Sequence, residues 1–314
     1  MMKATIRTEG LTRRFGRTLA LDHVDLAVPE GAIYALVGAN GAGKTTMIKL
    51  LMNIFRPTAG HSMVLGTDSL CLKGKAFERI GYVSENQELP EGMTAGSMLD
   101  YFRGFYPTWD RTLEAQLVRQ FDLPLERKLK HLSRGMRMKA DFAASLAYRP
   151  ALIVLDEPFS GLDPLVRDEL IECLLERAPE TTIFLSSHDL AEIESFSSHV
   201  GYLEQGRLLF SEEMQVLSGR FREVTVTLDK PQALPENLPA AWLQPQTVDC
   251  LVRFVHSGYE EDVAQKELAE IFPAARDSSF DPMTLRSIFL AIAKNGRDSA
   301  ASTSNRTAPQ EARA

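Results

Sequence analysis

The sequence predicts an α/β protein with a mostly parallel sheet, followed by a small second α/β domain. Short apolar runs recur along the chain at 32–38, 80–84, 151–155 and 181–185. These runs are continuous rather than alternating, which is typical of strands covered on both faces. Segments with helical spacing lie between them, as in a parallel sheet whose crossover connections are helices.

The composition is that of an ordinary globular protein. The chain has 314 residues, of which 44% are hydrophobic, enough for one large domain and a smaller one. Its 35 Lys and Arg stand against 42 Asp and Glu, and the net charge of −7 disfavours broad binding to nucleic acid or anionic lipid. The cysteines show no metal or redox spacing. With no secretion signal and no apolar run of about eighteen residues, we expect a cytoplasmic protein.

Local patterns predict the elements of the first domain, residues 1–220. Residues 22–28 alternate between apolar and other side chains, which predicts an antiparallel edge sheet before the core. Apolar residues at i, i+3, i+4 and i+7 after a glycine-rich loop predict a helix over 44–55. Strand-like runs are missing between about 86 and 148, so this insertion is predicted to be a helical subdomain.

Capping residues predict where several helices begin. Asp110 can cap a helix within the insertion. The pairs Asp163-Pro164 and Asp281-Pro282 each place a capping carboxylate before a proline at the first helical position. The two pairs therefore predict helices over 164–177 and 282–294.

The second domain, residues 221–294, is predicted to be a small accessory α/β domain. The strand pattern restarts after a hairpin that turns at Gln205-Gly206. Strands and helices are predicted in turn at 223–228, 248–255, 260–272 and 282–294. Residues 295–314 are small, polar and non-periodic, which predicts a disordered tail.

The segment GANGAGKTT at 38–46 predicts a phosphate-binding loop. It follows an apolar strand and opens an amphipathic helix, the setting that the pattern G-x-x-x-x-G-K-T requires. The glycines let backbone N–H groups wrap a phosphate, the lysine reaches the β and γ oxygens, and the hydroxyl binds Mg²⁺. The alternative is a glycine-rich turn with a solvated lysine. The candidate ligands are Gly38, Asn40, Gly41, Gly43, Lys44, Thr45 and Thr46.

Two carboxylates end the buried strand in ALIVLDEP at 151–158. Ligands of open α/β sheets lie at the carboxyl ends of strands. Adjacent acids there point in different directions, so Asp156 can bind Mg²⁺ while Glu157 acts as general base for an attacking water. His188 ends the next apolar strand, where it can contact the γ-phosphate or hold Glu157 in place. The alternatives are two acids that cap the next helix and an ordinary surface histidine.

The order of these motifs, with LSRGMRMKA at 132–140, resembles the nucleotide-binding subunit of ATP-binding-cassette (ABC) transporters over about residues 3–220. The resemblance implies an ATPase that powers transport and binds ATP and Mg²⁺. It also implies that two copies pack head to tail, so that Ser133 and Gly135, at a helix N-terminus, face the γ-phosphate held by the other copy. Lys44 would join Glu157 and His188 as a catalytic residue, because its charge offsets the charge that develops on the phosphate.

The resemblance assigns further positions one at a time. Phe15 stands where an aromatic ring stacks on adenine, although it could instead be a core residue of the edge sheet. Asp163 belongs to the loop that touches the partner's phosphate loop. Glu85 occupies a position that is usually glutamine, and its carboxylate could still reach Mg²⁺ or the water. Arg134 and Met136 depart from the commonest signature of the family, LSGGQ.

The insertion looks like that of bacterial exporters, which implies an integral membrane permease subunit as a separate partner. The aromatic residues within 101–110 would dock a short helix of that partner, although at least two of them could be ordinary core. The chain would lie peripherally at the cytoplasmic face of the membrane, as a homodimer or as a heterodimer with a related ATPase, and would bind no nucleic acid. The rival hypotheses are a soluble ABC-type regulatory ATPase with no transport role and a catalytically weak regulatory subunit.

Overall fold

The computed structural model describes residues 3–85, 92–235 and 237–304. The chain forms two compact units, Met1–Glu213 and Met214–Ala314. The division follows the last residue of a hairpin strand and precedes α7 (Met214–Arg220), so it lies a few residues before the expected boundary at 220. The first residues of the expected helical subdomain, 86–91, lie outside the described part of the chain.

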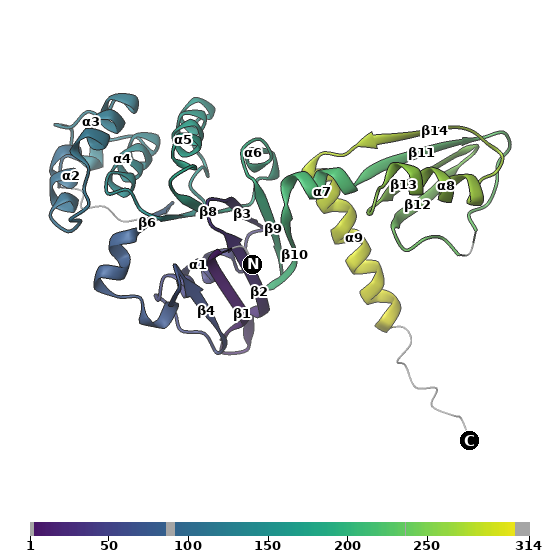
Figure 1. Cartoon of the computed structure of the whole chain (residues 1–314), viewed down its shortest axis with the longest axis horizontal. Coiled ribbons are helices and arrows are strands. Elements are labelled where there is room, and N and C mark those ends of the chain that lie inside the picture. The colour runs from purple at the N-terminus through teal and green to yellow at the C-terminus, as the bar shows by residue number, and fades with distance from the viewer. Residues whose placement is uncertain (1–2, 86–91, 236, 305–314) are drawn as a thin grey trace, which may run out of the picture. The chain divides into compact units, whose positions relative to one another are not determined.

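Within the described residues, the first unit contains a six-stranded sheet in which the predicted apolar runs pair in parallel (Figure 1). The order is β10-β9-β3-β8-β7-β6, where β9 is parallel to β3 and β10 is antiparallel to β9. β3, β7 and β8 are buried along their whole length, which is why their sequences read as continuous apolar runs. The mostly parallel α/β fold is therefore confirmed. The strands are β3 (Ile33–Val37), β6 (Ile80–Ser84), β7 (Leu152–Asp156), β8 (Thr182–Ser187), β9 (His199–Glu204) and β10 (Arg207–Glu213).

The hairpin between β9 and β10 turns at Gln205 and Gly206, as predicted. Both residues have positive φ, 48° and 81°, which matches the twist of the flanking strands. A Cβ on Gly206 would lie 2.8 Å from the carbonyl oxygen of Ala20. The turn therefore approaches the edge sheet closely, and its carbonyl accepts a hydrogen bond from the Asp22 N–H at 2.8 Å.

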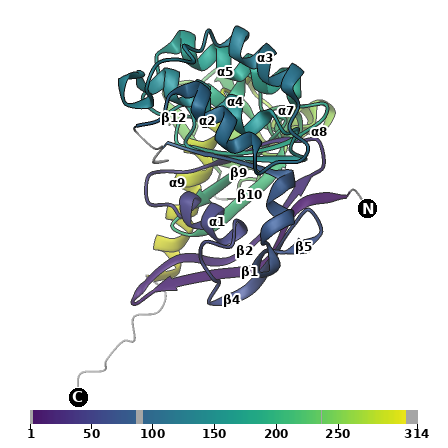
Figure 2. The same ribbon diagram turned by 90° about the vertical axis from the view of Figure 1, so that its left-hand side faces the viewer.

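The edge sheet is antiparallel, with the order β2-β1-β4-β5 (Figure 2). Val24, Leu26 and Val28 are buried while their neighbours are not, so the alternation in 22–28 is confirmed as a half-exposed strand. Apolar residues of both sheets pack with α1 in one core. The elements are β1 (Ala4–Phe15), β2 (Thr18–Pro29), β4 (Ala59–Val64), β5 (Thr67–Asp68) and α1 (Lys44–Leu51).

α1 ends earlier than the spacing predicted, because the chain leaves the helix at Asn53, which has φ 55°. The N–H groups of Ile54 and Phe55 both donate to the carbonyl of Lys49, which closes the last turn. Ile54 is therefore outside the helix and 55% exposed. The short helices η1 (Ser69–Cys71) and η2 (Gly74–Arg79) follow before β6.

The insertion between β6 and β7 is helical over the residues that the structure describes. α4 packs against α2, α3 and β6, and Figure 1 shows these helices grouped at one end of the first unit. Asp110 caps α3 and Asp163 caps α5, so both predicted helix starts are confirmed. The helices of the insertion are α2 (Ala95–Arg103), α3 (Arg111–Gln120), η3 (Leu129–His131) and α4 (Arg134–Leu146). Outside the insertion, α5 (Pro164–Arg177) follows β7, and α6 (Leu190–Glu194) follows β8.

Over its described residues, the second unit is an antiparallel sheet in the strand order β12-β13-β11-β14, with α7 and two further helices. Apolar side chains of the sheet and of α8 form its core, in which Trp242 stacks on Phe254 at a centroid separation of 3.8 Å. The elements are β11 (Arg222–Leu228), β12 (Trp242–Val248), β13 (Leu251–His256), α8 (Glu261–Ile271), β14 (Ala275–Pro282) and α9 (Leu285–Ser304).

Three expectations for this unit differ from the structure. The predicted strand 248–255 is interrupted by a turn at Asp249, which has φ 54°, and it separates β12 from β13. The predicted helix start at Asp281-Pro282 is wrong, because these residues pair with β11 inside β14. The helix begins three residues after Pro282, at Leu285, where the Thr284 hydroxyl accepts from the Ser287 N–H. α9 continues to Ser304 without a proline to stop it, so residues 295–304 are helical rather than part of a disordered tail. The rest of the predicted tail, 305–314, lies outside the described residues.

None of the helices in the described ranges is both long enough and apolar enough to cross a membrane.

Candidate nucleotide-binding and catalytic site

Two glycines of the loop 38–46, Gly38 and Gly43, are required by close backbone approaches. Gly43 ends the loop with φ 113°, and a Cβ there would lie 2.5 Å from the carbonyl oxygen of Ala20. A Cβ on Gly38 would lie 2.2 Å from the carbonyl oxygen of Leu203. Gly41, with φ 84°, adds a second left-handed position. The loop is therefore held between β2 and β9, and it leads into α1, whose first N–H groups form an anion-binding helix end.

Lys44, the first residue of α1, is buried and bonded to its own loop. Its ammonium donates to the carbonyl oxygens of Gly38 at 2.6 Å and Ala39 at 3.3 Å, and it pairs with Glu157 Oε1 at 3.0 Å. The side chain is 5% exposed, so these oxygens replace its hydration shell. A buried ammonium at the end of a glycine-rich loop fits a bound polyphosphate, whose oxygens can accept from the ammonium and from backbone N–H groups of the loop.

Asp156 and Thr45 lie side by side at the end of β7. The Thr45 hydroxyl donates to Asp156 Oδ1 at 3.1 Å, and the Ser186 hydroxyl donates to the same oxygen at 2.8 Å. Burial raises the pKa of Asp156, while these two hydrogen bonds oppose the shift. A carboxylate beside a hydroxyl is a pair of oxygen ligands of the kind that Mg²⁺ prefers, so the residues fit the metal that the sequence implies.

Glu157 is held between a lysine and a histidine. Its Oε1 pairs with Lys44, and its Oε2 lies 2.7 Å from His188 Nδ1. Its backbone N–H donates to Ser186 Oγ at 3.0 Å, and its φ of 51° is a conformation that costs energy for a residue with a side chain. The structure thus brings together Lys44, Glu157 and His188, the three residues expected to be catalytic.

Phe15 lies at the surface of the edge sheet, where it is 39% exposed. Its ring contacts the edge of Phe55 at a centroid separation of 5.4 Å. The guanidinium of Arg13 lies over the ring, 4.3 Å from its centroid, a contact that sequence reasoning missed although Arg13 stands two residues before Phe15. Asn40 is exposed in the phosphate loop, and Thr46 is half-buried in the first turn of α1.

The signature residues form an exposed helix N-terminus. Ser133 caps α4, and its hydroxyl accepts a hydrogen bond from the Met136 N–H at 3.2 Å. Gly135 lies against α5, because a Cβ on it would be 3.1 Å from a methyl carbon of Val166. Within the described parts of the chain, no hydrogen bond joins Ser133 or Gly135 to the phosphate loop of the same chain. Asp163 caps α5 beside this surface.

Glu85 is paired with a residue that sequence reasoning did not connect to it. Its Oε1 lies 2.5 Å from Arg134 Nη2, and its N–H donates to the carbonyl of Asp156 at 3.1 Å. The backbone of Glu85 is therefore next to the expected metal site, while its carboxylate is bonded to the signature helix. Gln87, a glutamine two residues further along the chain, lies outside the described residues.

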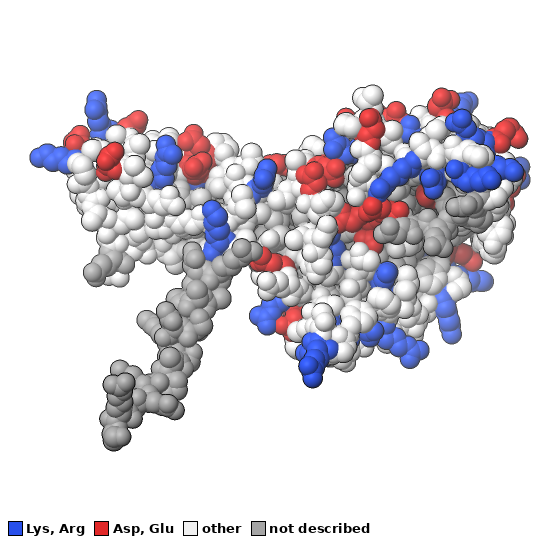
Figure 3. All heavy atoms as spheres, turned by 180° about the vertical axis from the view of Figure 1, so that it is seen from behind, with Lys and Arg blue, Asp and Glu red and all other residues white. Residues whose placement is uncertain are grey.

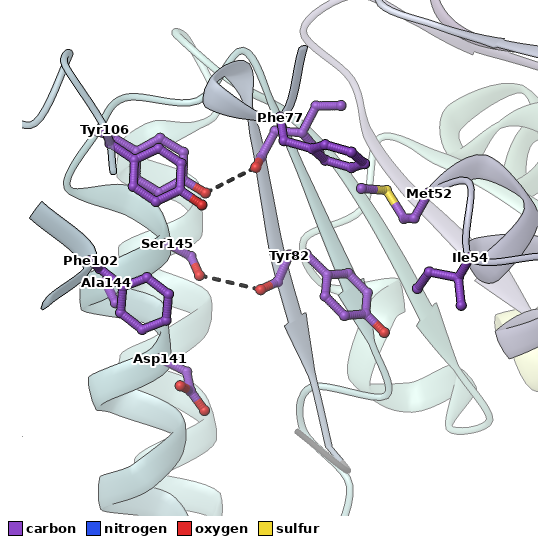
Figure 4. Close-up of a pocket in the computed structure, with 11 residues that line it drawn as sticks. Met52, Ile54, Phe77, Tyr82, Phe102, Tyr106, Asp141, Ala144 and Ser145 are labelled. Carbon is purple, nitrogen blue, oxygen red and sulfur yellow. Dashed lines mark hydrogen bonds between the residues drawn. The ribbon is translucent and has the colours of Figure 1, made fainter. Parts of the chain in front are cut away.

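A groove of about 330 Å³ runs between α4 and the core of the same unit, and Figure 4 shows its lining. On one side lie Tyr82 and Met52, and on the other Phe102 and Asp141. Burial raises the pKa of Asp141 to about 7, and Arg137 opposes the shift. Sequence reasoning missed Asp141, because an acid in an amphipathic helix is usually a solvated residue. A second hollow beside the groove is lined by Tyr101 and Phe105, both more than half exposed, among other residues.

Comparisons with known proteins agree with this geometry. A family model described as "ABC transporter" matches residues 21–160. The chain is 31% identical over 229 residues to the bacitracin transport ATP-binding protein BcrA of Enterococcus faecalis, and the match covers 72% of this chain and 74% of that protein. It is 35% identical over 210 residues to the daunorubicin resistance ATP-binding protein DrrA2 of Streptomyces coeruleorubidus, and the match covers 65% of each. A solved structure of an ATP-binding subunit of an ABC transporter is 28% identical with a TM-score of 0.61, and the match covers 68% of this chain and 92% of that chain.

The matched family segment contains the phosphate loop, the signature residues, Asp156 and Glu157, all of which lie in the first unit. These comparisons show that the chain belongs to the ABC transporter family, as an ATP-binding subunit that hydrolyses ATP.

Proposed function

We propose that two copies of this ATPase, or this chain and a related ATPase, close head to tail on ATP and power export through a separate integral membrane subunit. The relatives named above act in bacitracin transport and daunorubicin resistance, and resistance to a drug is what its export would provide. A subunit in this role would lie peripherally at the cytoplasmic face of the membrane. The partner subunit, and not this chain, would contact the exported molecule.

The division of the site supports head-to-tail closure. Lys44, Thr45 and Asp156 lie together, whereas Ser133 caps a helix that makes no hydrogen bond to them among the described residues. The exposed N–H groups and positive end of α4 favour an anion. A second copy can supply that anion as the γ-phosphate of its own ATP, so each site is complete only when two copies meet.

The contacts of Lys44 suggest how ATP binding prepares the base. In this structure the Lys44 ammonium is paired with Glu157 Oε1. The triphosphate offers Lys44 other oxygens, which frees this carboxylate oxygen to orient a water and accept its proton. His188 keeps the other oxygen, so the carboxylate retains its direction. Thr45 and Asp156 would hold Mg²⁺, which would supply positive charge to offset that of the phosphates.

The groove beside α4 supports a docking role toward the membrane subunit. Tyr101 and Phe105 are exposed, whereas Phe102 and Trp109 are half-buried, so the aromatic segment serves both as surface and as packing. Two hollows share Phe77, Phe102 and Tyr106 and so form one continuous apolar surface. A short amphipathic helix buries its apolar face in a groove of this kind.

Co-purification with the membrane protein encoded by a neighbouring gene tests this function. We expect the parent chain and Leu70→Asp, a change of an exposed leucine outside the groove, to co-purify with it. Phe105→Asp should lose co-purification while ATP binding stays at the parental level, because a carboxylate in an apolar contact is costly. An ATPase that co-purifies with no membrane protein would instead support the soluble regulatory alternative. On the face that Figure 3 shows, basic and acidic side chains of the first unit are intermixed, so this face does not favour binding to nucleic acid.

A further inference from the structure

Glu85 and Arg134, two positions at which this chain departs from the usual motifs of its family, contact each other. Arg134 Nη2 lies 2.5 Å from Glu85 Oε1, although the two residues are 49 positions apart in the chain. Their side chains are 47% and 26% exposed. The departures are therefore one joint feature of the fold rather than two separate changes.

The pair joins the signature helix to the carboxyl end of the central sheet. Glu85 directly follows β6, and its N–H donates to the carbonyl of Asp156 at 3.1 Å. Arg134 is the first residue of α4, directly after the cap Ser133. The ion pair thus connects the segment beside Asp156 with the helix end that carries Ser133 and Gly135.

A third segment, which contains Gly161, lies next to the same guanidinium. Gly161 lies beside it, because a Cβ on Gly161 would be 3.1 Å from Arg134 Nη1 and 3.4 Å from Cζ. The φ of Gly161 is 63°, so its conformation and its space both suit glycine. Gly135 packs as tightly on Val166 of α5. The guanidinium therefore lies where the residue after β6, the N-terminus of α4 and the segment before α5 meet.

Each charge is unfavourable where it stands alone. A cation in the first turn of a helix opposes the positive end of the helix dipole. A third carboxylate beside Asp156 and Glu157 adds repulsion between like charges, and it would also repel a triphosphate. Together, Glu85 neutralises Arg134 and Arg134 neutralises Glu85. The local environment thus favours having both residues or neither.

We propose that Glu85 and Arg134 are a matched positioning pair that fixes the N-terminus of α4 to the core sheet, so that Ser133 and Gly135 are presented to the ATP held by a second copy. In this arrangement Glu85 acts through Arg134 and is not a metal ligand. The proposal rests on the head-to-tail function stated above. An ion pair of this exposure adds little to global stability, so its effect lies in the position of α4.

A cycle of Glu85→Gln, Arg134→Gly and the double variant tests the pair. The first readout is amide hydrogen exchange of residues 133–140 in the nucleotide-free protein, where the Met136 and Arg137 N–H groups bond to Ser133. Each single change should speed this exchange by about tenfold or more, because it leaves one charge unpaired. The double variant, which restores neutral residues at both positions, should return to within about threefold of the parent.

The second readout is ATP-driven dimerisation in a Glu157→Gln background, measured by sedimentation. Each single change should raise the dimer dissociation constant by about tenfold or more, and the double variant should recover most of this loss. Arg149→Gln is the matched control, because Arg149 pairs with Asp110 and the two side chains are 48% and 26% exposed. It should leave both readouts at the parental level.

The outcomes separate this proposal from the proposed function. The proposal is wrong if the fold-changes of the two single variants multiply in the double variant. It is also wrong if the single variants match the parent in hydrogen exchange. A parent that binds ATP without dimerising would instead contradict the head-to-tail function, while hydrogen exchange would still report on the pair.

Discussion

Glu157 is the residue on which the chemistry of the site depends most. Its carboxylate oxygens are held by Lys44 and His188, and its N–H by Ser186. Its left-handed conformation at the end of β7 is retained against a local energy cost. The direction of the carboxylate is thus set before ATP arrives, which is how positioning lowers a barrier.

Glu157→Gln should bind ATP but hydrolyse it at least about a hundredfold more slowly, the lower range for loss of a positioned base. The amide keeps the size of the side chain and can still accept from Lys44, but it cannot take a proton from water. Steady-state ATPase assays and ATP titration of the same protein measure the two effects. Glu180→Gln, which changes an exposed carboxylate paired with Arg149, is the control and should keep parental turnover. Turnover of Glu157→Gln within a few-fold of the parent would remove Glu157 from the role of base.

At the residue scale, the sequence predicted the site residues that stand in short contiguous motifs. It did not predict contacts between residues that only the packing of the fold brings together. Lys44, Thr45, Asp156 and Glu157 stand in short motifs whose setting is readable from the pattern itself. The contact between Glu85 and Arg134 joins two motifs 49 positions apart, and nothing in either motif specifies its partner. The ion pair of Lys44 with Glu157 was missed for the same reason, because it depends on the parallel pairing that brings α1 beside the end of β7.

At the element scale, strands and capped helices were predictable and several boundaries were not. Asp163-Pro164 opens α5 where expected. The identical dipeptide at 281–282 lies in β14, because pairing with β11 outweighs a local capping preference. Pro282 is tolerated there as the last residue of its strand. Long apolar runs thus predict strands reliably, whereas tertiary contacts can override the helix start that a dipeptide such as Asp-Pro predicts.

α4 carries two functions along its length, because its first residues belong to the signature and its middle lines the groove. Asp141 lies on this helix, and burial raises the pKa of its carboxyl to about 7 from an ordinary value of 3.8. Because the folded state holds the proton more tightly than the unfolded chain, this group lowers the free energy of unfolding as pH rises from about 4 to about 7. Above about pH 7 the effect of this group on the free energy of unfolding no longer changes with pH.

Asp141→Asn should therefore raise the melting temperature more at pH 8 than at pH 5. The amide keeps the shape of the side chain and removes the charge whose burial is costly. A gain of about 1 kcal/mol, which corresponds to about 2–4 °C for a protein of this size, is expected at pH 8. Thermal unfolding at the two pH values measures it. An equal shift at both pH values would show that the ionisation of Asp141 is not the cause.

For the whole molecule, the net charge is −7, so the positive charge that binds a phosphate must be concentrated locally. The site gathers its positive charge from Lys44, the N-terminus of α1 and the N-terminus of α4 rather than from a broad basic surface. The first two lie in one place, whereas the third is exposed on α4. This separation is the feature that makes the association of two copies, rather than a change within one copy, the expected response to ATP.

Ser133→Asp tests that response with little disturbance of the fold. Aspartate caps a helix as well as serine does, so α4 should stay intact. Its negative charge would face the triphosphate held by the other copy, and the Coulomb repulsion should weaken ATP-driven dimerisation by at least about tenfold. ATP affinity of the single copy should stay within about threefold of the parent, because the phosphate loop is untouched. Ser133→Asn, a neutral cap of the same size as aspartate, is the control and should still dimerise. Sedimentation of both variants in a Glu157→Gln background gives the comparison, and an aspartate variant that dimerises like the asparagine one would place Ser133 away from the partner's nucleotide.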